Sequence, residues 1–156
     1  MLHGGGTPGF SSVVHLYPEH RLAVILLANQ GDRVLDQLAL DVAGMVDPTL
    51  ARKVAEVDPD PVRSRRLGEV VRDLLEGGGG TPEMTPALQL FLRTTTGKGN
   101  GEWLASHGPL TGWAFAEAET IGPLQVLRYR VVLGEDPYWF SVALDREGRI
   151  AQITSW

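Results

Sequence analysis

The sequence predicts an α+β protein: an amino-terminal β-hairpin and helix, followed by helices packed on a curved, four-stranded antiparallel sheet. Two strand-length apolar segments joined by a short polar turn lie near the start. Apolar residues recur at helical spacing in the middle, and apolar and polar residues alternate in the last third. Helices that precede hairpin-linked strands are typical of the α+β class. The chain has 156 residues, 43% hydrophobic and 21% charged, which suits one ordinary globular domain or two very small ones.

The first element expected is a hairpin. Residues 10–17 are β-branched and aromatic, a polar turn follows at 18–21, and residues 22–28 are apolar throughout. Two such segments around a short turn indicate antiparallel pairing. Because the second segment is apolar at every position, we expect a central strand that is covered on both faces. The glycine-rich stretch that begins at His3 is expected to be a turn whose N–H groups can hold a developing negative charge.

A helix is expected to follow the hairpin and to reach Val46. Asp32 is the expected N-cap, and Asp47-Pro48 ends the helix. Hairpin and helix together are too small to bury a core by themselves. The apolar residues that recur at helical spacing are Val34, Leu35, Leu38, Leu40, Val42 and Met45.

Residues 48–61 are punctuated by proline and aspartate, and we predict a linker there between a first domain, 1–47, and a second, 62–156. The second domain begins with an amphipathic helix over 62–76. Its four arginines are expected to form a solvated face and not a site for an anionic partner: Arg63, Arg65, Arg66 and Arg72.

Glycine-rich segments separate the next elements. Residues 77–80 are four glycines, expected to form a flexible linker before a helix over 83–95. Residues 96–101 contain three glycines and are expected to form a loop, with a short helical turn after it. A Walker phosphate loop is excluded, because Leu92 and Gly99 stand where that motif needs glycine and Ser or Thr.

The last third is predicted to be a meander of four strands in which alternate side chains leave one face wet. Residues 145–148 are expected to be the last hairpin turn. The strands are expected at residues 110–118, 124–133, 138–144 and 149–155.

Composition excludes several functions. A net charge of −5 argues against a nucleic-acid partner, and without cysteine there is neither a disulfide nor a thiolate metal site. The four histidines show no paired spacing, so no metal or other cofactor is expected. The longest apolar run, 22–28, is too short to span a membrane. The start of the chain lacks the features of a signal peptide, so a cytoplasmic location is expected for the chain as it stands.

The first 47 residues carry motifs in a specific order. His3-Gly-Gly and Pro8-Gly-Phe-Ser-Ser12 come first, then a strand, Pro18-Glu19, a second apolar strand ending at Asn29, and a helix. This order resembles the carboxy-terminal part of the serine β-lactamase-like family, which includes class C-type β-lactamases, D-alanyl-D-alanine peptidases and related esterases.

The resemblance implies a remnant of an active site. His3 would take the position of the Lys or His in the family's Lys-Thr-Gly or His-x-Gly motif, and Gly5 that of the motif glycine. The Gly6 N–H would be one half of the oxyanion hole. The family is often exported, and its nucleophile lies in a Ser-x-x-Lys motif with a partner in Tyr-x-Asn or Tyr-x-Ser. Neither motif occurs in this sequence, so no acyl-enzyme is expected from this chain alone.

Two other interpretations of the His-Gly-Gly-Gly motif remain open. It is also an oxyanion motif of hormone-sensitive-lipase-type α/β-hydrolases, but the Gly-x-Ser-x-Gly elbow that these enzymes need is absent. Alternatively, it is a mobile terminal loop with no role.

Residues 62–156 have a resemblance of their own. Helices, then His107-Gly-Pro-Leu-Thr111, Arg128-Tyr-Arg130 and Leu144-Asp-Arg-Glu-Gly-Arg-Ile150 occur in this order. The pattern is similar to the NTF2-like or cystatin-like accessory domain appended to many β-lactamase-like hydrolases. Such folds often enclose a pocket between helices and sheet. Its polar residues would be His107, Glu117, Glu119 and Tyr129.

Three functions therefore stay open. The favoured one is a carboxy-terminal fragment of a serine hydrolase whose second domain has an accessory or interaction role. The second is a stand-alone NTF2-like small-ligand binder or small pocket enzyme. The third is a hydrolase that receives its nucleophile from another chain.

The lone hairpin predicts self-association. Its strand edges are unpaired, so we expect a homo-oligomer formed through them. The terminal Trp156 is expected to pack against another surface. The apolar side chains expected to be exposed are Val24, Leu26 and Leu27.

Overall fold

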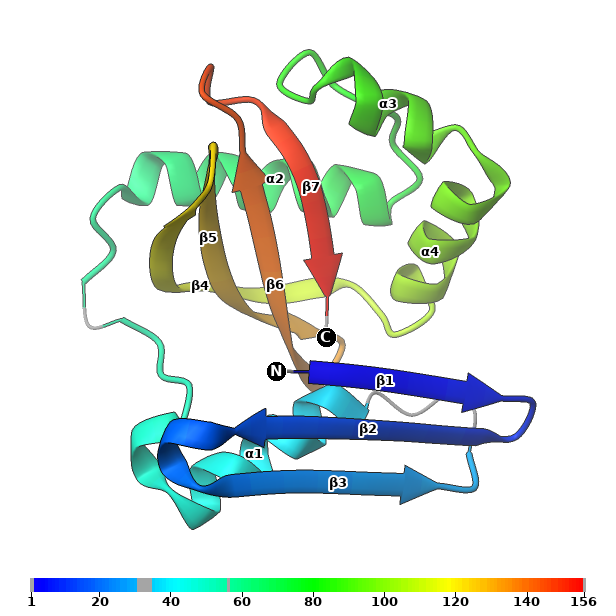
Figure 1. Ribbon diagram of the computed structural model, residues 1–156. Helices are drawn as coiled ribbons and strands as arrows, with labels where there is room; N and C mark the ends of the chain where they lie inside the picture. The colour runs from blue at the N-terminus through cyan, green and yellow to red at the C-terminus, as the bar shows by residue number, and fades with distance from the viewer. Residues whose placement is uncertain (1, 31–34, 56, 156) are drawn as a thin grey trace. The chain divides into compact units, whose positions relative to one another are not determined.

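The computed structural model describes residues 2–30, 35–55 and 57–155 (Figure 1). It confirms the predicted α+β class, with four α-helices and two antiparallel sheets among these residues. The chain divides into two compact units, residues 1–53 and 54–155, and the division falls within the segment 48–61. The expected N-cap Asp32, the helix position Val34 and the terminal Trp156 lie outside the described residues.

The amino-terminal unit, residues 1–53, is a three-stranded sheet with a helix on one face. Its strands β1 (Leu2–Thr7), β2 (Phe10–Tyr17) and β3 (Leu22–Ala28) are antiparallel in the order β1-β2-β3 (Figure 1). Helix α1 (Leu35–Val46) contacts β2 and β3. Short 3-10 turns follow β2 (Pro18–His20) and α1 (Pro48–Leu50).

The glycine-rich start is a strand, so the prediction of a turn there was wrong. Every residue of β1 pairs with β2, from Leu2 opposite His15 to Thr7 opposite Phe10. The turn is confined to Pro8 and Gly9, where Gly9 has a φ of 83° that few other residues adopt. Strand pairing therefore overrides the conformational freedom of the other glycines.

Strand β3 is an edge strand, so the prediction of a central strand was also wrong. Among the described residues β3 pairs only with β2. Val24 is buried on the helix side, whereas Ile25 and Leu27 are 61% and 81% exposed. A single helix covers only one face of the sheet, so the other face of this apolar strand stays open. Of the three side chains expected to be exposed, Leu27 is exposed, whereas Val24 is buried and Leu26 is half-buried. Ile25, which was not expected to be exposed, is exposed as well.

The core of this unit is small. Among the residues of this unit that the structure describes, it consists of five buried apolar residues, Val13, Val24, Leu35, Ala39 and Ala43. Two alanines on α1 let the helix approach the sheet closely. Other apolar residues of α1 face away from this core, and Leu38 and Met45 are 50% and 80% exposed.

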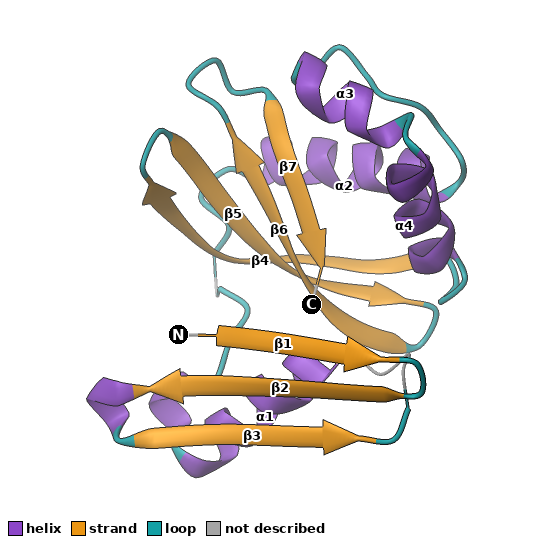
Figure 2. Cartoon of the chain, turned by 45° about the vertical axis from the view of Figure 1, so that its right-hand side comes forward, coloured by secondary structure: helices purple, strands orange, loops and turns teal. Residues whose placement is uncertain are grey.

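The carboxy-terminal unit, residues 54–155, has three helices and the predicted four-stranded meander (Figure 2). The sheet order is β4-β5-β6-β7, and its strands curve around α2. The strands are β4 (Leu110–Ile121), β5 (Leu124–Leu133), β6 (Asp136–Leu144) and β7 (Ile150–Ser155), and the helices are α2 (Pro61–Leu75), α3 (Pro86–Leu92) and α4 (Thr95–Ala105).

Helix α2 begins with local signals that the sequence provides. Pro61 stands at the first helical position, and the Asp60 carboxylate accepts a hydrogen bond from the Arg63 N–H, which caps the helix. The helix packs against the inner face of the sheet, where the largest fully buried side chains are Tyr129 and Phe140. The other members of this core include Leu67, Val70, Val71, Met84, Val131, Leu133, Val142 and Ile150.

Residues 96–101 belong to α4, so the predicted loop was wrong. The Thr94 side chain accepts a hydrogen bond from the Gly97 N–H and caps the helix. Gly97 is buried, and a Cβ there would collide with the Phe91 carbonyl, so close packing against the end of α3 requires glycine. Each interior helical glycine costs about 1 kcal/mol relative to alanine. Packing against α3 and capping offset that cost, which composition alone does not reveal.

Two of the four glycines at 77–80, where a flexible linker was expected, contact neighbouring segments. Gly77 has a φ of 89°, which suits the residue that follows a helix. The Gly78 N–H donates to the Asp73 carbonyl at 2.7 Å. A Cβ on Gly80 would lie 2.8 Å from the Gln89 Cγ. These contacts join the end of α2 to α3.

Among the residues that the structure describes, no helix has both the length and the apolar character needed to cross a membrane.

Candidate functional site

Strand β1 presents the glycines of the His-Gly-Gly motif at a sheet edge. Thr7 and Phe10 flank a two-residue turn, and such a flanking pair exchanges backbone hydrogen bonds. Bonded and non-bonded pairs alternate along an antiparallel ladder, so Gly5 bonds to β2 whereas Gly4 and Gly6 do not. The N–H and C=O groups of Gly4 and Gly6 therefore point away from β2, where no described strand pairs with them.

The fold of the chain does not itself require these glycines. None of Gly4, Gly5 and Gly6 has a positive φ. A Cβ on Gly4 would lie 3.8 Å from the Ser12 carbonyl oxygen, and one on Gly6 would lie 3.4 Å from the Phe10 carbonyl oxygen, which are ordinary contacts. A Cβ on Gly5 would lie 3.3 Å from the Ser12 hydroxyl oxygen, a tighter contact with the movable end of a side chain. Glycine weakens a strand interior and often marks the close approach of a ligand or another backbone. The motif is therefore compatible with a partner that approaches β1.

His3 and Gly5 share one face of the sheet. They pair with Val14 and Ser12, which alternate with Val13 and His15 on the helix side. His3 is exposed on the face opposite α1. The three residues predicted for the motif therefore lie on the same stretch of β1. His3 and Gly5 belong to one face of the sheet, and the Gly6 N–H points outward from its edge.

The serines nearest to this motif are not activated nucleophiles. The Ser12 hydroxyl donates to the Gly5 carbonyl at 3.2 Å, and the Ser11 hydroxyl donates to the Gln30 carbonyl at 2.7 Å. An activated serine needs a base within hydrogen-bond reach. Neither serine is bonded to a histidine or lysine within the described part of the chain.

The predicted pocket residues of the second unit do not converge. The His107 ring packs edge-on against Trp103 and Tyr138, and its Nδ1 lies 2.8 Å from the Trp103 carbonyl oxygen. Glu117 and Glu119 lie on the outer face of the sheet, where both bind the Arg128 guanidinium at 2.9–3.0 Å. These side chains do not form an acid–base pair.

Tyr129 is a core residue and not a pocket residue. It is fully buried, and its hydroxyl lies 3.0 Å from the buried Ser64 hydroxyl. Trp113 stacks on its ring with centroids 4.3 Å apart. Burial raises the pKa of Tyr129, so the phenol stays neutral and serves packing rather than proton transfer.

Sequence reasoning missed a group of hydrogen-bonded side chains between the first sheet and α1. His15 is 1% exposed, its Nε2 lies 2.9 Å from an Asp36 carboxylate oxygen, and its Nδ1 lies 3.3 Å from the Tyr17 hydroxyl. His15 and Tyr17 alternate with outward residues of β2, so the strand pattern placed them on one face. This face of the sheet is opposite to the face that carries His3. The hydrogen bonds of His15 therefore connect α1 to β2 and do not reach the edge of β1.

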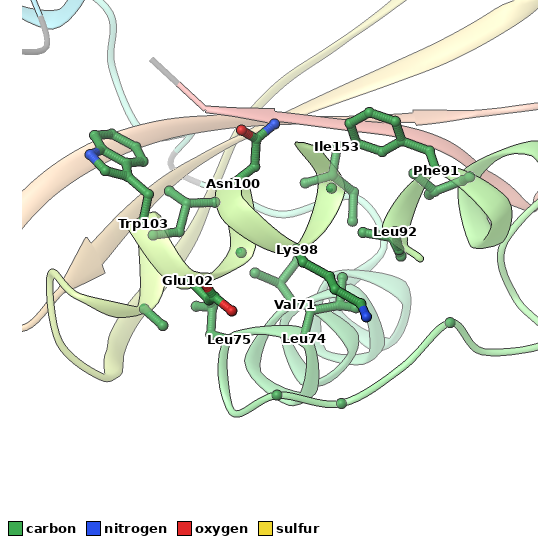
Figure 3. Close-up of a pocket in the computed structure, with 18 of the residues that line it drawn as sticks. Val71, Leu74, Leu75, Phe91, Leu92, Lys98, Asn100, Glu102, Trp103 and Ile153 are labelled. Carbon is green, nitrogen blue, oxygen red and sulfur yellow. The ribbon is translucent and has the colours of Figure 1, made fainter. Parts of the chain in front are cut away.

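A cavity in the carboxy-terminal unit was also missed. Its volume is about 840 Å³, and α2, residues 77–80, α3, α4 and the end of β7 line it on the sides that do not open to solvent (Figure 3). Glycines form part of its wall, so backbone faces the space where side chains would otherwise fill it. Its labelled lining in Figure 3 comprises Val71, Leu74, Leu75, Phe91, Leu92, Lys98, Asn100, Glu102, Trp103 and Ile153.

Comparisons of the chain with models of protein families, with curated proteins and with solved structures found no match. Within residues 2–30, 35–55 and 57–155, no three His, Cys, Asp or Glu side chains gather as a metal site would require.

Proposed function

We propose that residues 1–53 are the active-site strand unit of a β-lactamase-like serine hydrolase, and that residues 54–155 are its accessory unit. The observation that carries this proposal is the edge of β1. There His3 and Gly5 share a face, and the Gly6 N–H points outward from a strand whose glycines its own packing does not require.

The chemistry proposed for this edge is stabilisation of an oxyanion. A substrate carbonyl lies along β1, and a serine hydroxyl attacks its carbon while the Gly6 N–H donates to the oxygen. The leaving group departs with a proton, and water then releases the acid from the acyl-serine. One oxyanion donor contributes about 3–4 kcal/mol to such a step. The serine comes from a Ser-x-x-Lys segment outside these 156 residues, so this chain alone does not turn over substrate.

The other sheet edge supports association. Strand β3 has seven residues without charge or proline, and it carries none of the features that keep an exposed edge from pairing. Ile25 and Leu27 extend this apolar surface over the open face. We propose that the isolated chain forms a homo-oligomer through β3.

A second candidate function is small-ligand binding by the carboxy-terminal unit. The cavity of about 840 Å³ favours it, because ligand sites commonly have volumes of about 300–1,000 Å³ and mostly apolar walls.

Complementation tests the hydrolase proposal. The protein is mixed with a β-lactamase-like hydrolase that retains Ser-x-x-Lys and Tyr-x-Asn but lacks its carboxy-terminal strands, and hydrolysis of a chromogenic cephalosporin and a p-nitrophenyl ester is followed. We expect turnover only in the mixture. Absence of turnover for both reporters, with the two chains shown to associate, would overturn the proposal.

Two proline variants sharpen the test. Gly6→Pro removes the outward N–H without breaking the ladder to β2, since proline is tolerated where the N–H faces the open side of an edge strand. Gly4→Pro is the matched control, because its N–H also points outward but does not occupy the proposed oxyanion position. We expect a loss of about 100-fold or more for Gly6→Pro only. Equal losses for both variants would contradict the assignment of Gly6.

Reading the coding sequence ahead of Met1 complements this experiment. A Ser-x-x-Lys and a Tyr-x-Asn or Tyr-x-Ser in the same frame would place nucleophile and oxyanion donor in one polypeptide. Their absence would require a second chain.

A further inference from the structure

We propose that the cavity of the carboxy-terminal unit binds an amphipathic carboxylate: an apolar chain that carries one anionic group. This inference names the ligand class for the second candidate function. It does not depend on the hydrolase proposal, because every residue that lines the cavity belongs to residues 54–155.

The apolar part of the ligand is matched by the cavity wall. Leu74 and Leu75 of α2 face Phe91 of α3 and Trp103 of α4 across the space, and Ile153 of β7 closes one side (Figure 3). Phe91 and Trp103 remain 42% and 40% exposed. An apolar chain between them would remove this surface from water, which is favourable in proportion to the area buried.

Glycine keeps the space open. A Cβ on Gly101 would meet no atom within 4 Å, although this residue lines the cavity. Gly97 lies one turn earlier on the same face of α4, and it is fixed by packing against α3. Gly99 has equally open surroundings but does not line the cavity. A side chain would therefore fit at either glycine, but only a side chain at Gly101 would enter the cavity.

The charges of the wall favour an anion. Two cations, Arg93 and Lys98, and one carboxylate, Glu102, line the cavity, which leaves a positive balance. Within the described residues, no acidic side chain lies within ion-pair distance of Arg93 or Lys98. Lys98 and Glu102 are one helical turn apart on α4 and both extend toward α2 in Figure 3. A ligand carboxylate beside Lys98 would supply a counter-charge at the exposed rim of the cavity, while the apolar chain lies along its wall.

Titration calorimetry on the full chain tests this proposal with three probes of equal length: decanoate, decan-1-ol and decyltrimethylammonium. We expect saturable binding with decanoate the tightest and decyltrimethylammonium the weakest. Octanoate is expected to bind about 15-fold more weakly than decanoate, at about fourfold for each methylene removed.

Variants separate the apolar and charged parts of the site. Gly101→Leu fills the cavity and is expected to weaken decanoate binding at least tenfold, whereas Gly99→Leu is its matched control and leaves the affinity unchanged. Lys98→Gln is expected to weaken decanoate at least threefold and to leave decan-1-ol unchanged. Cooperative thermal unfolding of each variant verifies that it folds, which we expect because leucine favours a helix over glycine.

Three results would overturn the proposal. One is the absence of saturable decanoate binding up to millimolar concentration. Another is equal weakening by Gly101→Leu and Gly99→Leu, which would place the ligand elsewhere. The third is binding of decan-1-ol or decyltrimethylammonium at least as tight as that of decanoate. This last result would leave a ligand site in the cavity but refute its preference for an anion.

Discussion

Helix α4 provides the sharpest test of the fold, because its glycine content predicts a loop and the structure shows a helix. Gly99 is the fifth helical residue of Thr95–Ala105, so its N–H lies in the helix interior and bonds to the carbonyl four residues earlier. Its surroundings are open, so a side chain there meets no packing obstacle. Two substitutions at this position therefore report on backbone conformation alone.

Gly99→Ala is expected to stabilise the protein by about 1 kcal/mol, and Gly99→Pro to destabilise it by about 3 kcal/mol. The proline removes a helical hydrogen bond and its ring meets the preceding turn. For a unit of this size, each kcal/mol shifts the melting temperature by roughly 4–8 °C. Urea unfolding followed by circular dichroism at 222 nm measures both free energies of unfolding. A Gly99→Pro variant within about 1 kcal/mol of the parent would refute the helix, because a loop accommodates proline there.

Three further perturbations follow from the structure. Hydrogen bonds from the Thr49 hydroxyl and then His20 lower the pKa of Asp47 from 3.8 to about 2. The Asp47 carboxylate contributes to stability above pH 3.8, and this contribution is lost as the pH falls through 2. Asp47→Asn is therefore expected to make the free energy of unfolding depend less on pH between 3.8 and 2, as measured by acid unfolding. Tyr129→Phe leaves the buried Ser64 hydroxyl without its partner and is expected to lower the free energy of unfolding by about 1–3 kcal/mol. The double variant with Ser64→Ala is expected to recover most of this loss, as measured by urea unfolding. Leu27→Lys is expected to convert the proposed homo-oligomer to a monomer in sedimentation equilibrium, and an unchanged mass would contradict association through β3.

Sequence patterns predicted the elements whose local and tertiary preferences agree. Strand β5 matches its predicted range, 124–133, because period-two alternation, β-branched residues and turn signals all favour it. The predictions for the glycine-rich segments were wrong for one common reason. In β1 and α4, strand pairing and helix packing outweigh the weak local preference of glycine. Strand β3 failed because an apolar sequence does not say whether anything covers its second face.

A bulge in β4 places Glu117 outside the predicted pocket. Phe115 and Glu117 are two residues apart, so simple alternation places them on one face of β4. The pairing shifts between them: Phe115 lies opposite Tyr129, and Glu117 lies opposite Arg128 on the outer face. A bulge reverses the facing of every residue beyond it, and no residue type in this stretch marks its position. The cavity escaped prediction because its wall includes residues 77–80, whose position depends on the contacts of Gly78 with Asp73 and of Gly80 with Gln89.

The two units should differ in local stability. The amino-terminal unit has a core of five buried residues, two of them alanines, and it leaves several large apolar side chains exposed. The carboxy-terminal unit buries Tyr129, Phe140 and the aliphatic residues around them. Buried apolar area sets most of the free energy of local opening. The first unit is therefore expected to open at lower free energy than the second, as a strand unit that relies on a partner would.

Native-state hydrogen exchange measures this difference in the intact chain. We expect amides of β2 and β3 to exchange through openings of lower free energy than those of β5 and β6, by several kcal/mol. A partner that supplies the missing strand and helix cover, such as the complementing hydrolase chain, should raise protection in β2 and β3 and leave β5 and β6 unchanged. Equal protection of both sheets in the chain alone would contradict the dependence of the first unit on a partner. Such a result would weaken the hydrolase proposal and leave the cavity of the second unit as the better-supported site.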